Sequence, residues 1–169
     1  MEKVFSILNE MREKGILRDY AIGGAVATLY YTEPFGTQDV DIFFPISTRK
    51  NIISLTPFYD FLLSKKGLKT HKEYIMIGDI PIQFLPAISA LEEEAIENAI
   101  EVNYKGLYVK IFTPEYLIAI FLKVGRVKDK FKIMKLLEQA SIDKKLLQDI
   151  LNRYNLRDKF DKFRETYYA

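Results

Sequence analysis

Hydrophobic residues recur along the chain at spacings typical of helices and of strands. Near the start, four apolar residues fall at helical spacing before Gly15, and the capping-box pair Ser89 and Glu92 opens a later helix. Beyond about residue 112 every stretch has helical periodicity. We expect helices over residues 2–14, 25–31, 48–65, from 89 onward, 113–124, 127–140, 143–153 and 156–166.

Short apolar runs bounded by glycine, proline or polar turns predict strands between these helices. The expected strands are residues 19–22, 37–44, 73–77, 80–85 and a segment within 104–112. The chain therefore begins as mixed α/β and ends as helix only. We predict an α+β fold in which residues 1–112 form a mixed β-sheet flanked by helices. Residues 113–169 would form a C-terminal helical subdomain packed on it.

The composition suits one globular core. Of 169 residues, 49% are hydrophobic, and none is cysteine, which excludes disulfides, thiolate zinc sites and a cysteine nucleophile. The start of the chain lacks a continuous apolar run, and no run elsewhere approaches the length of a membrane span. We expect a cytoplasmic protein without a membrane partner. The single histidine, His71, lies among polar residues and is expected to be solvated.

Charge is unevenly distributed along the chain. Residues 1–122 carry 12 Lys/Arg and 16 Asp/Glu, whereas residues 123–169 carry 13 Lys/Arg and 7 Asp/Glu. A basic C-terminal part indicates an anionic partner such as nucleotide phosphates or RNA. The alternative is a set of solvated helix faces without a ligand.

Two aspartates in an otherwise apolar strand are the strongest chemical signal. Residues two apart on a strand point to the same face, so Asp39 and Asp41 project together while Val40 and Ile42 point into a core. Two adjacent carboxylates repel each other and need a cation to offset that repulsion. Their oxygen atoms suit Mg²⁺, which usually takes one or two carboxylates and substrate phosphates.

A double glycine lies at an expected strand-to-helix junction. Gly23 and Gly24 allow close approach of a ligand to the backbone, and the helix that follows offers free N–H groups at its N-terminus. The pair is either a phosphate cradle or an ordinary tight turn.

Together these two features resemble the nucleotidyltransferase superfamily of DNA polymerase β. Its pattern is a Gly-Gly or Gly-Ser turn followed by Asp-x-Asp on the next strand, which Gly23-Gly24 and Asp39-Val40-Asp41 match. Thr37 stands where relatives often have Thr or Ser. The resemblance implies a nucleotidyltransferase fold, Mg²⁺ held by the two aspartates, and an NTP as substrate.

A second motif resembles the AbiEii-type toxin nucleotidyltransferases. In that motif Lys, Arg and Lys/Arg-Asp follow one another, as Lys123, Arg126 and Lys128-Asp129 do here. Because Lys123 and Arg126 are three residues apart, we expect them to share a helix face and hold the triphosphate, with Lys123 also among the catalytic residues. The resemblance implies RNA, commonly the tRNA 3′ end, as acceptor and a cognate antitoxin as partner.

The sequence departs from these patterns in two places. Active members place a third carboxylate on a later strand, where this chain has Gln83, which offers a neutral oxygen and cannot take a proton. The second motif expects an acid where this chain has Lys132. Asp129 either supplies a substitute carboxylate or pairs with Arg126 on the surface, and Asp79 is a weaker substitute.

Three functions follow from these residues. The first is transfer of a nucleoside monophosphate from an NTP to a hydroxyl of RNA or protein. The second is a nucleotide-binding or interaction domain that has lost turnover because of Gln83. The third is transfer to a small molecule such as an antibiotic.

Overall fold

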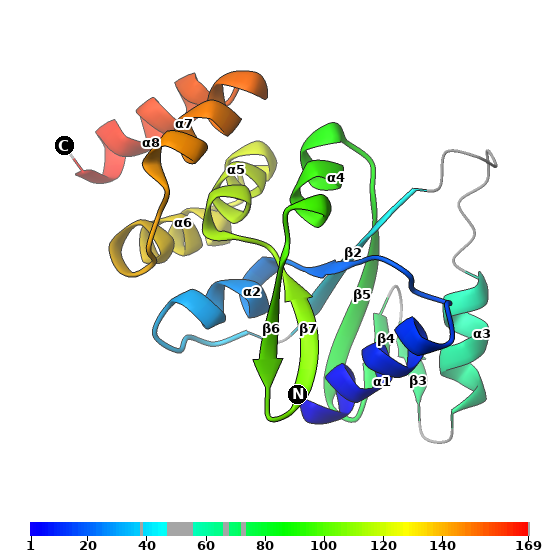
Figure 1. Cartoon of the computed structure of the whole chain (residues 1–169). Helices are drawn as coiled ribbons and strands as arrows, with labels where there is room; N and C mark the ends of the chain where they lie inside the picture. Colours follow the sequence, from blue (N-terminus) through cyan, green and yellow to red (C-terminus); the bar gives the residue numbers. More distant parts are fainter. Residues whose placement is uncertain (38, 47–55, 66–67, 72–73, 169) are drawn as a thin grey trace.

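A computed structural model of the chain describes residues 1–37, 39–46, 56–65, 68–71 and 74–168. Within these residues, seven strands form one mixed sheet in the order β3-β4-β5-β2-β1-β7-β6 (Figure 1). The strands are β1 (Ala21–Ile22), β2 (Val40–Pro45), β3 (Lys69–His71), β4 (Tyr74–Ile77), β5 (Ile80–Ala87), β6 (Ile100–Tyr104) and β7 (Leu107–Ile111).

Eight helices accompany this sheet within the described ranges. They are α1 (Glu2–Glu13), α2 (Gly24–Tyr31), α3 (Thr56–Ser64), α4 (Ala90–Glu97), α5 (Pro114–Val124), α6 (Val127–Gln139), α7 (Lys144–Arg153) and α8 (Arg157–Tyr168). Helix α1 packs on β7, α2 and α4 pack on β2, and α5 joins α4 to α6 and α7. The predicted α+β architecture, a mixed sheet flanked by helices, is confirmed. Helix α5 contacts α2 and α4, and α6 contacts α2. The boundary at residue 112 stays a prediction.

Most predicted elements agree with the structure, and the strands that were missed lie at the sheet edges. The sequence interpretation missed β3 and β6, which form the two outer strands. Both are short and largely exposed, so their residues lack the buried alternation by which strands are recognised. Strand β2 begins at Val40, three residues later than expected, and it includes Pro45. Most of the helix predicted over 48–65 lies outside the described residues.

Two predicted helix starts can be checked directly. Ser89 caps α4 through the expected capping box, because its hydroxyl accepts from Glu92 N and the Glu92 carboxylate accepts from Ser89 N. Thr113 is the N-cap of α5 with Pro114 following it, but its side chain makes no capping hydrogen bond. No helix among the described residues is long and apolar enough to cross a bilayer.

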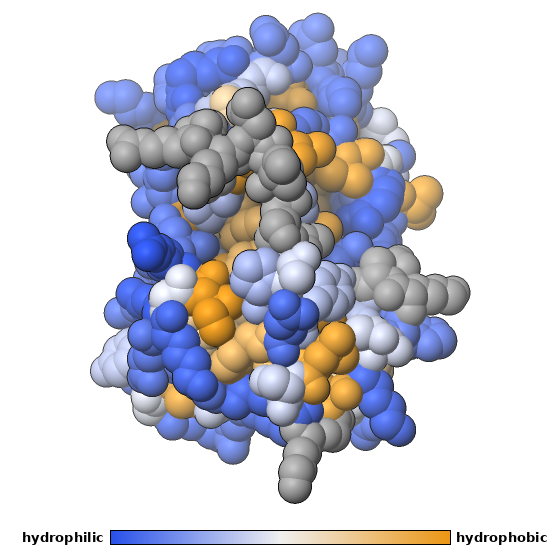
Figure 2. Space-filling view, turned by 90° about the vertical axis from the view of Figure 1, so that its right-hand side faces the viewer, coloured by the Kyte–Doolittle hydropathy of each residue, from blue (hydrophilic) through white to orange (hydrophobic). Residues whose placement is uncertain are grey.

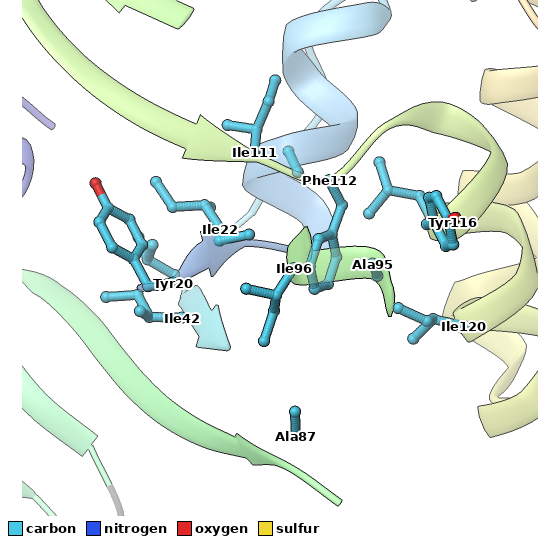
Figure 3. Close-up of a cluster of buried hydrophobic side chains, with 14 of the residues drawn as sticks. Tyr20, Ile22, Ile42, Ala87, Ala95, Ile96, Ile111, Phe112, Tyr116 and Ile120 are labelled. Atoms are coloured by element: carbon cyan, nitrogen blue, oxygen red, sulfur yellow. The ribbon is translucent and has the colours of Figure 1, made fainter. Parts of the chain in front are cut away.

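The central strands and the helices above them share one hydrophobic core. Ile22 and Ile42 from neighbouring strands and Phe112 after β7 are completely buried, and they face Ile96 of α4 and Ile120 of α5 (Figure 3). This shared core fixes the start of β2 against α4 and α5.

The side of the molecule that carries α3 and β3 is mainly hydrophilic, with several hydrophobic patches (Figure 2).

Hydrogen bonds to a single carboxylate, that of Glu94, attach α7 to the rest of the protein. Glu94 of α4 accepts two hydrogen bonds of 2.6 Å from the Arg153 guanidinium and one of 2.7 Å from the Tyr116 hydroxyl. The Tyr154 hydroxyl donates to the same carboxylate. Hydrogen bonding by Arg153, followed by the two tyrosines, lowers the pKa of Glu94 to about 2.

We expect Glu94→Gln to weaken this attachment in a pH-dependent way. An unfolded glutamate has a pKa of about 4.3, so the charge stabilises the fold above that pH and the contribution is lost as pH falls toward 2. Urea denaturation at pH 7 should show a loss of about 1–3 kcal/mol in the free energy of unfolding. The difference from wild type should shrink between pH 4 and pH 2.

The exposed pair of Arg157 and Asp161 provides a control. Asp161→Asn should change the free energy of unfolding by less than about 1 kcal/mol at any of these pH values. A Glu94→Gln effect that stays constant from pH 7 to pH 2 would contradict the assignment to charge.

Candidate active site

Asp39 and Asp41 lie together at the start of β2. Both line a cleft with a volume of about 370 Å³, while Val40 and Ile42 between and beyond them are completely buried. The predicted alternation is therefore confirmed. Burial, followed by the repulsion from Asp39, raises the pKa of Asp41, and the positive charges of Lys132, Arg126 and Lys128 oppose this effect. Burial and mutual repulsion therefore disfavour two negative charges at this place, and a bound cation would offset that repulsion.

The double glycine packs directly against this pair. The Gly23 N–H donates a 2.9 Å hydrogen bond to the Asp41 carbonyl, and α2 begins at Gly24. Gly24 has a φ of +57°, and a Cβ placed there would lie 2.1 Å from Asp41 Oδ2. A Cβ at Gly23 would lie 2.6 Å from the Phe43 ring. Side chains are excluded at both positions, so the backbone at the start of α2 borders the cleft directly.

Gln83 occupies the neighbouring strand at the level of Asp41. Strands β2 and β5 are parallel, Asp41 and Gln83 are direct partners in their register, and both side chains line the cleft. The position expected to hold a third carboxylate therefore carries an amide. Asp79 lies in the exposed turn before β5, where it borders a different hollow together with Thr37 and Asp39.

Cationic residues from the start of α6 border the cleft. Arg126 precedes the helix as its N-cap, and Lys128 and Lys132 are four residues apart on it. The predicted shared face of Lys123 and Arg126 is wrong, because Gly125 adopts the left-handed conformation and ends α5 between them. Lys123 Nζ instead lies 3.6 Å from Oε1 of Glu92, which itself lines the cleft.

Asp129 is completely buried beneath these cations. Its carboxylate accepts hydrogen bonds from Arg126 Nε at 2.8 Å, Arg126 Nη2 at 3.1 Å and Lys132 Nζ at 3.1 Å. Of the two predicted roles, pairing with Arg126 is therefore the one observed, although in the interior and not on the surface. These bonds outweigh the effect of burial and lower the pKa of Asp129, so it is a carboxylate.

Sequence reasoning did not place Lys132 in the site. The signal was present, since residues four apart on a helix share a face and Lys128 was already in the motif. A second hollow of about 830 Å³ adjoins the cleft, and both Lys132 and Lys128 line it with Thr37, Asp39 and Phe131. Thr37 donates a long hydrogen bond of 3.5 Å to the Asp39 carbonyl.

A family model matches residues 1–167, almost the whole chain. The chain belongs to the family described as "Nucleotidyl transferase of unknown function (DUF2204)". No curated protein sequence gives a significant match to this nucleotidyltransferase-family chain.

Two solved structures share the fold. An antigenic nucleotidyltransferase-like protein from Paracoccidioides brasiliensis has 18% identity and a TM-score of 0.60, with 96% of this chain and 90% of that chain covered. The solution structure of the antibiotic-resistance factor ANT(2'')-Ia has 16% identity and a TM-score of 0.56, with 99% and 97% covered. At such identities the likeness shows the nucleotidyltransferase fold alone.

A nucleotidyltransferase family implies an NTP substrate and Mg²⁺, and the cleft fits this metal. Asp39 and Asp41 supply carboxylate oxygens and Gln83 an amide oxygen, which are the hard donors that Mg²⁺ prefers. In the part of the chain that the structure describes, no three His, Cys, Asp or Glu residues gather as a metal site. Mg²⁺ commonly completes its shell with substrate phosphates and water, so two carboxylates are sufficient.

We expect Gly24→Ala to disrupt this corner of the fold. The left-handed backbone costs a non-glycine residue about 1–2 kcal/mol, and the added Cβ would displace the Asp41 carboxylate. Urea denaturation should therefore show a loss of at least about 1–2 kcal/mol in the free energy of unfolding. Gly36→Ala is the matched control, because a Cβ at Gly36 meets nothing within 4 Å and should be neutral or slightly stabilising. Equal stabilities of the two variants would contradict the close contact.

Proposed function

We propose that this chain transfers a nucleoside monophosphate from a Mg²⁺-bound NTP to an acceptor hydroxyl. The observation that carries the proposal is one cleft with two opposed walls. Asp39 and Asp41 line one side beside the Gly23–Gly24 turn, and Arg126 and Lys128 line the other. This arrangement has the charges that a metal–triphosphate complex requires.

The chain's own residues would bind and orient the substrate. Asp39 and Asp41 would hold the metal, which neutralises phosphate charge when bound. The backbone at the start of α2 would contact phosphate oxygens, and Arg126 would donate to the triphosphate. Thr37 stays a candidate because it lines the adjoining hollow with Asp39. Lys123 stays a candidate although it pairs with Glu92, a residue that lines the cleft.

The reaction itself needs little covalent help from the protein. The acceptor oxygen forms a bond to the α-phosphorus, the bond from that phosphorus to the β-phosphate oxygen breaks, and pyrophosphate leaves while the hydroxyl proton is released. Positioning and neutralisation of charge supply most of the acceleration in such transfers.

The acceptor that best fits the charge distribution is RNA. Residues 123–169 carry 13 basic and 7 acidic residues, and the cations that line the cleft, Arg126, Lys128 and Lys132, belong to this part of the chain. Together with the AbiEii-type motif, this favours the tRNA 3′ end. A toxin role with a protein antitoxin as partner rests on that motif resemblance.

Removal of the carboxylate pair should abolish metal-dependent nucleotide binding. We expect isothermal titration calorimetry to detect ATP binding to wild type only when Mg²⁺ is present. The double variant Asp39→Asn plus Asp41→Asn should bind ATP at least about 100-fold more weakly, since two charged metal ligands are lost. Asp60→Asn, an exposed acid on α3, is the matched control and should bind as wild type does. Absence of binding to wild type would end the proposal.

Acceptor choice requires a separate experiment. Each of the four NTPs, labelled at the α-phosphate, is incubated with Mg²⁺ and either total tRNA, the protein alone or an aminoglycoside. Label in tRNA, dependent on Asp39 and Asp41, is expected. Label only in the aminoglycoside or in protein would exclude the RNA acceptor but not the transfer reaction.

Gln83 supports a second candidate function, a nucleotide-binding domain without turnover. Its amide lies beside Asp41 in the sheet and cannot act as a base. We expect Gln83→Glu to tighten Mg²⁺ binding in the presence of ATP, by about tenfold, because it adds a carboxylate to the cleft. Turnover that appears only in Gln83→Glu would favour the second candidate, and unchanged Mg²⁺ binding would remove Gln83 from the metal site.

A further inference from the structure

Lys132 is a nearly buried lysine in the wall of the candidate active site. Its side chain is only 9% exposed, yet it lines both the Asp39–Asp41 cleft and the adjoining hollow. Helix α6, which carries it, packs against α2 and α5 (Figure 1). Lys132 thereby lines the same cleft as Asp39 and Asp41.

A buried ammonium is costly unless its surroundings compensate for the lost water. Within the described part of the chain, its single hydrogen-bond acceptor is Asp129 Oδ1, at 3.1 Å. The ammonium also lies 4.7 Å from the centre of the Phe121 ring, a favourable cation–π distance. An ammonium has three N–H donors, so Lys132 keeps donating capacity that a ligand in the cleft it lines could use.

Asp129 does not neutralise Lys132 completely, because it is shared. The same carboxylate binds the Arg126 guanidinium through Nε and Nη2. One negative charge therefore serves two cations, and the cluster of Arg126, Asp129 and Lys132 retains a net positive charge. Lys132 and Arg126 line the same cleft as Asp39 and Asp41, so this positive charge lies beside the carboxylate pair.

We propose that Lys132 binds the polyphosphate of the nucleotide directly, and that Asp129 is a positioning residue that holds Lys132 and Arg126 at the cleft. The inference rests on the proposed function, because it assumes that a metal–NTP complex occupies the cleft. It adds a phosphate-binding residue at a position where the related toxin motif has an acid.

The test compares ligands that differ only in their number of phosphates. ATP, ADP and AMP are titrated by calorimetry with Mg²⁺ into wild type and Lys132→Met, which keeps the length of the side chain but removes its charge. We expect ATP affinity to fall about 10- to 100-fold, as for the loss of a charged hydrogen bond, and AMP affinity to change by less than about threefold.

Lys130→Met is the matched control. It removes the same charge from the same helix, but Lys130 lines a groove with Lys159 and Phe163, away from the carboxylate pair. Its ATP affinity should stay within about twofold of wild type, since one distant exposed charge is largely screened.

Asp129→Asn tests the positioning role. It should weaken ATP binding in the wild-type background, and the loss should be smaller when Lys132→Met is already present, because the two residues act through one contact. A loss of equal size in both backgrounds would overturn the role of Asp129 in positioning Lys132.

The outcomes separate this inference from the proposed function. If wild type binds ATP and a folded Lys132→Met binds it equally well, or loses ATP and AMP affinity alike, the inference is wrong and the proposed function stands. If wild type binds no nucleotide, the proposed function fails. If Lys132→Met fails to fold, the double variant Lys132→Met plus Asp129→Asn also removes the carboxylate that Lys132 leaves unpaired. An ATP affinity of this double variant equal to that of wild type would overturn the inference.

Discussion

The contact between Gly24 and the Asp41 carboxylate leaves room for a hydrogen atom and nothing larger. A Cβ would lie 2.1 Å from Asp41 Oδ2, and Gly24 also has the left-handed φ that glycine adopts most readily. The neighbouring Gly23 N–H holds the carbonyl of the same aspartate. The turn thus fixes both the backbone and the side chain of Asp41, and the position of the carboxylate pair depends on it.

The opposite wall of the cleft is organised by one buried charge. Asp129 is inaccessible to solvent, and it orients two cations that compete for it. A buried ion pair adds little net stability, because desolvation offsets much of the attraction. The ion pairs of Asp129 therefore serve to hold positive charge beside the cleft more than to stabilise the fold.

Much of this arrangement could be predicted from local sequence patterns. Alternation of apolar and acidic residues predicted that Asp39, just before β2, and Asp41 within it share one face, and the glycine pair marked the start of α2. Interactions between distant segments could not be predicted in this way. The burial of Asp129 and Lys132 arises because α6 packs against α2 and α5, and no pattern within α6 encodes that contact. The sheet edges were missed for a similar reason, since their exposed residues carry no periodic signal.

The left-handed Gly125 has a mechanical consequence. It ends α5 at Val124, so Arg126 at the N-cap and Lys128 and Lys132 in the first two turns all belong to α6, whereas Lys123 does not. A helix moves as a rigid rod over such a length. A small rotation or translation of α6 against α2 would therefore move all three cations together. The electrostatic field in the cleft would then depend on the position of this one helix.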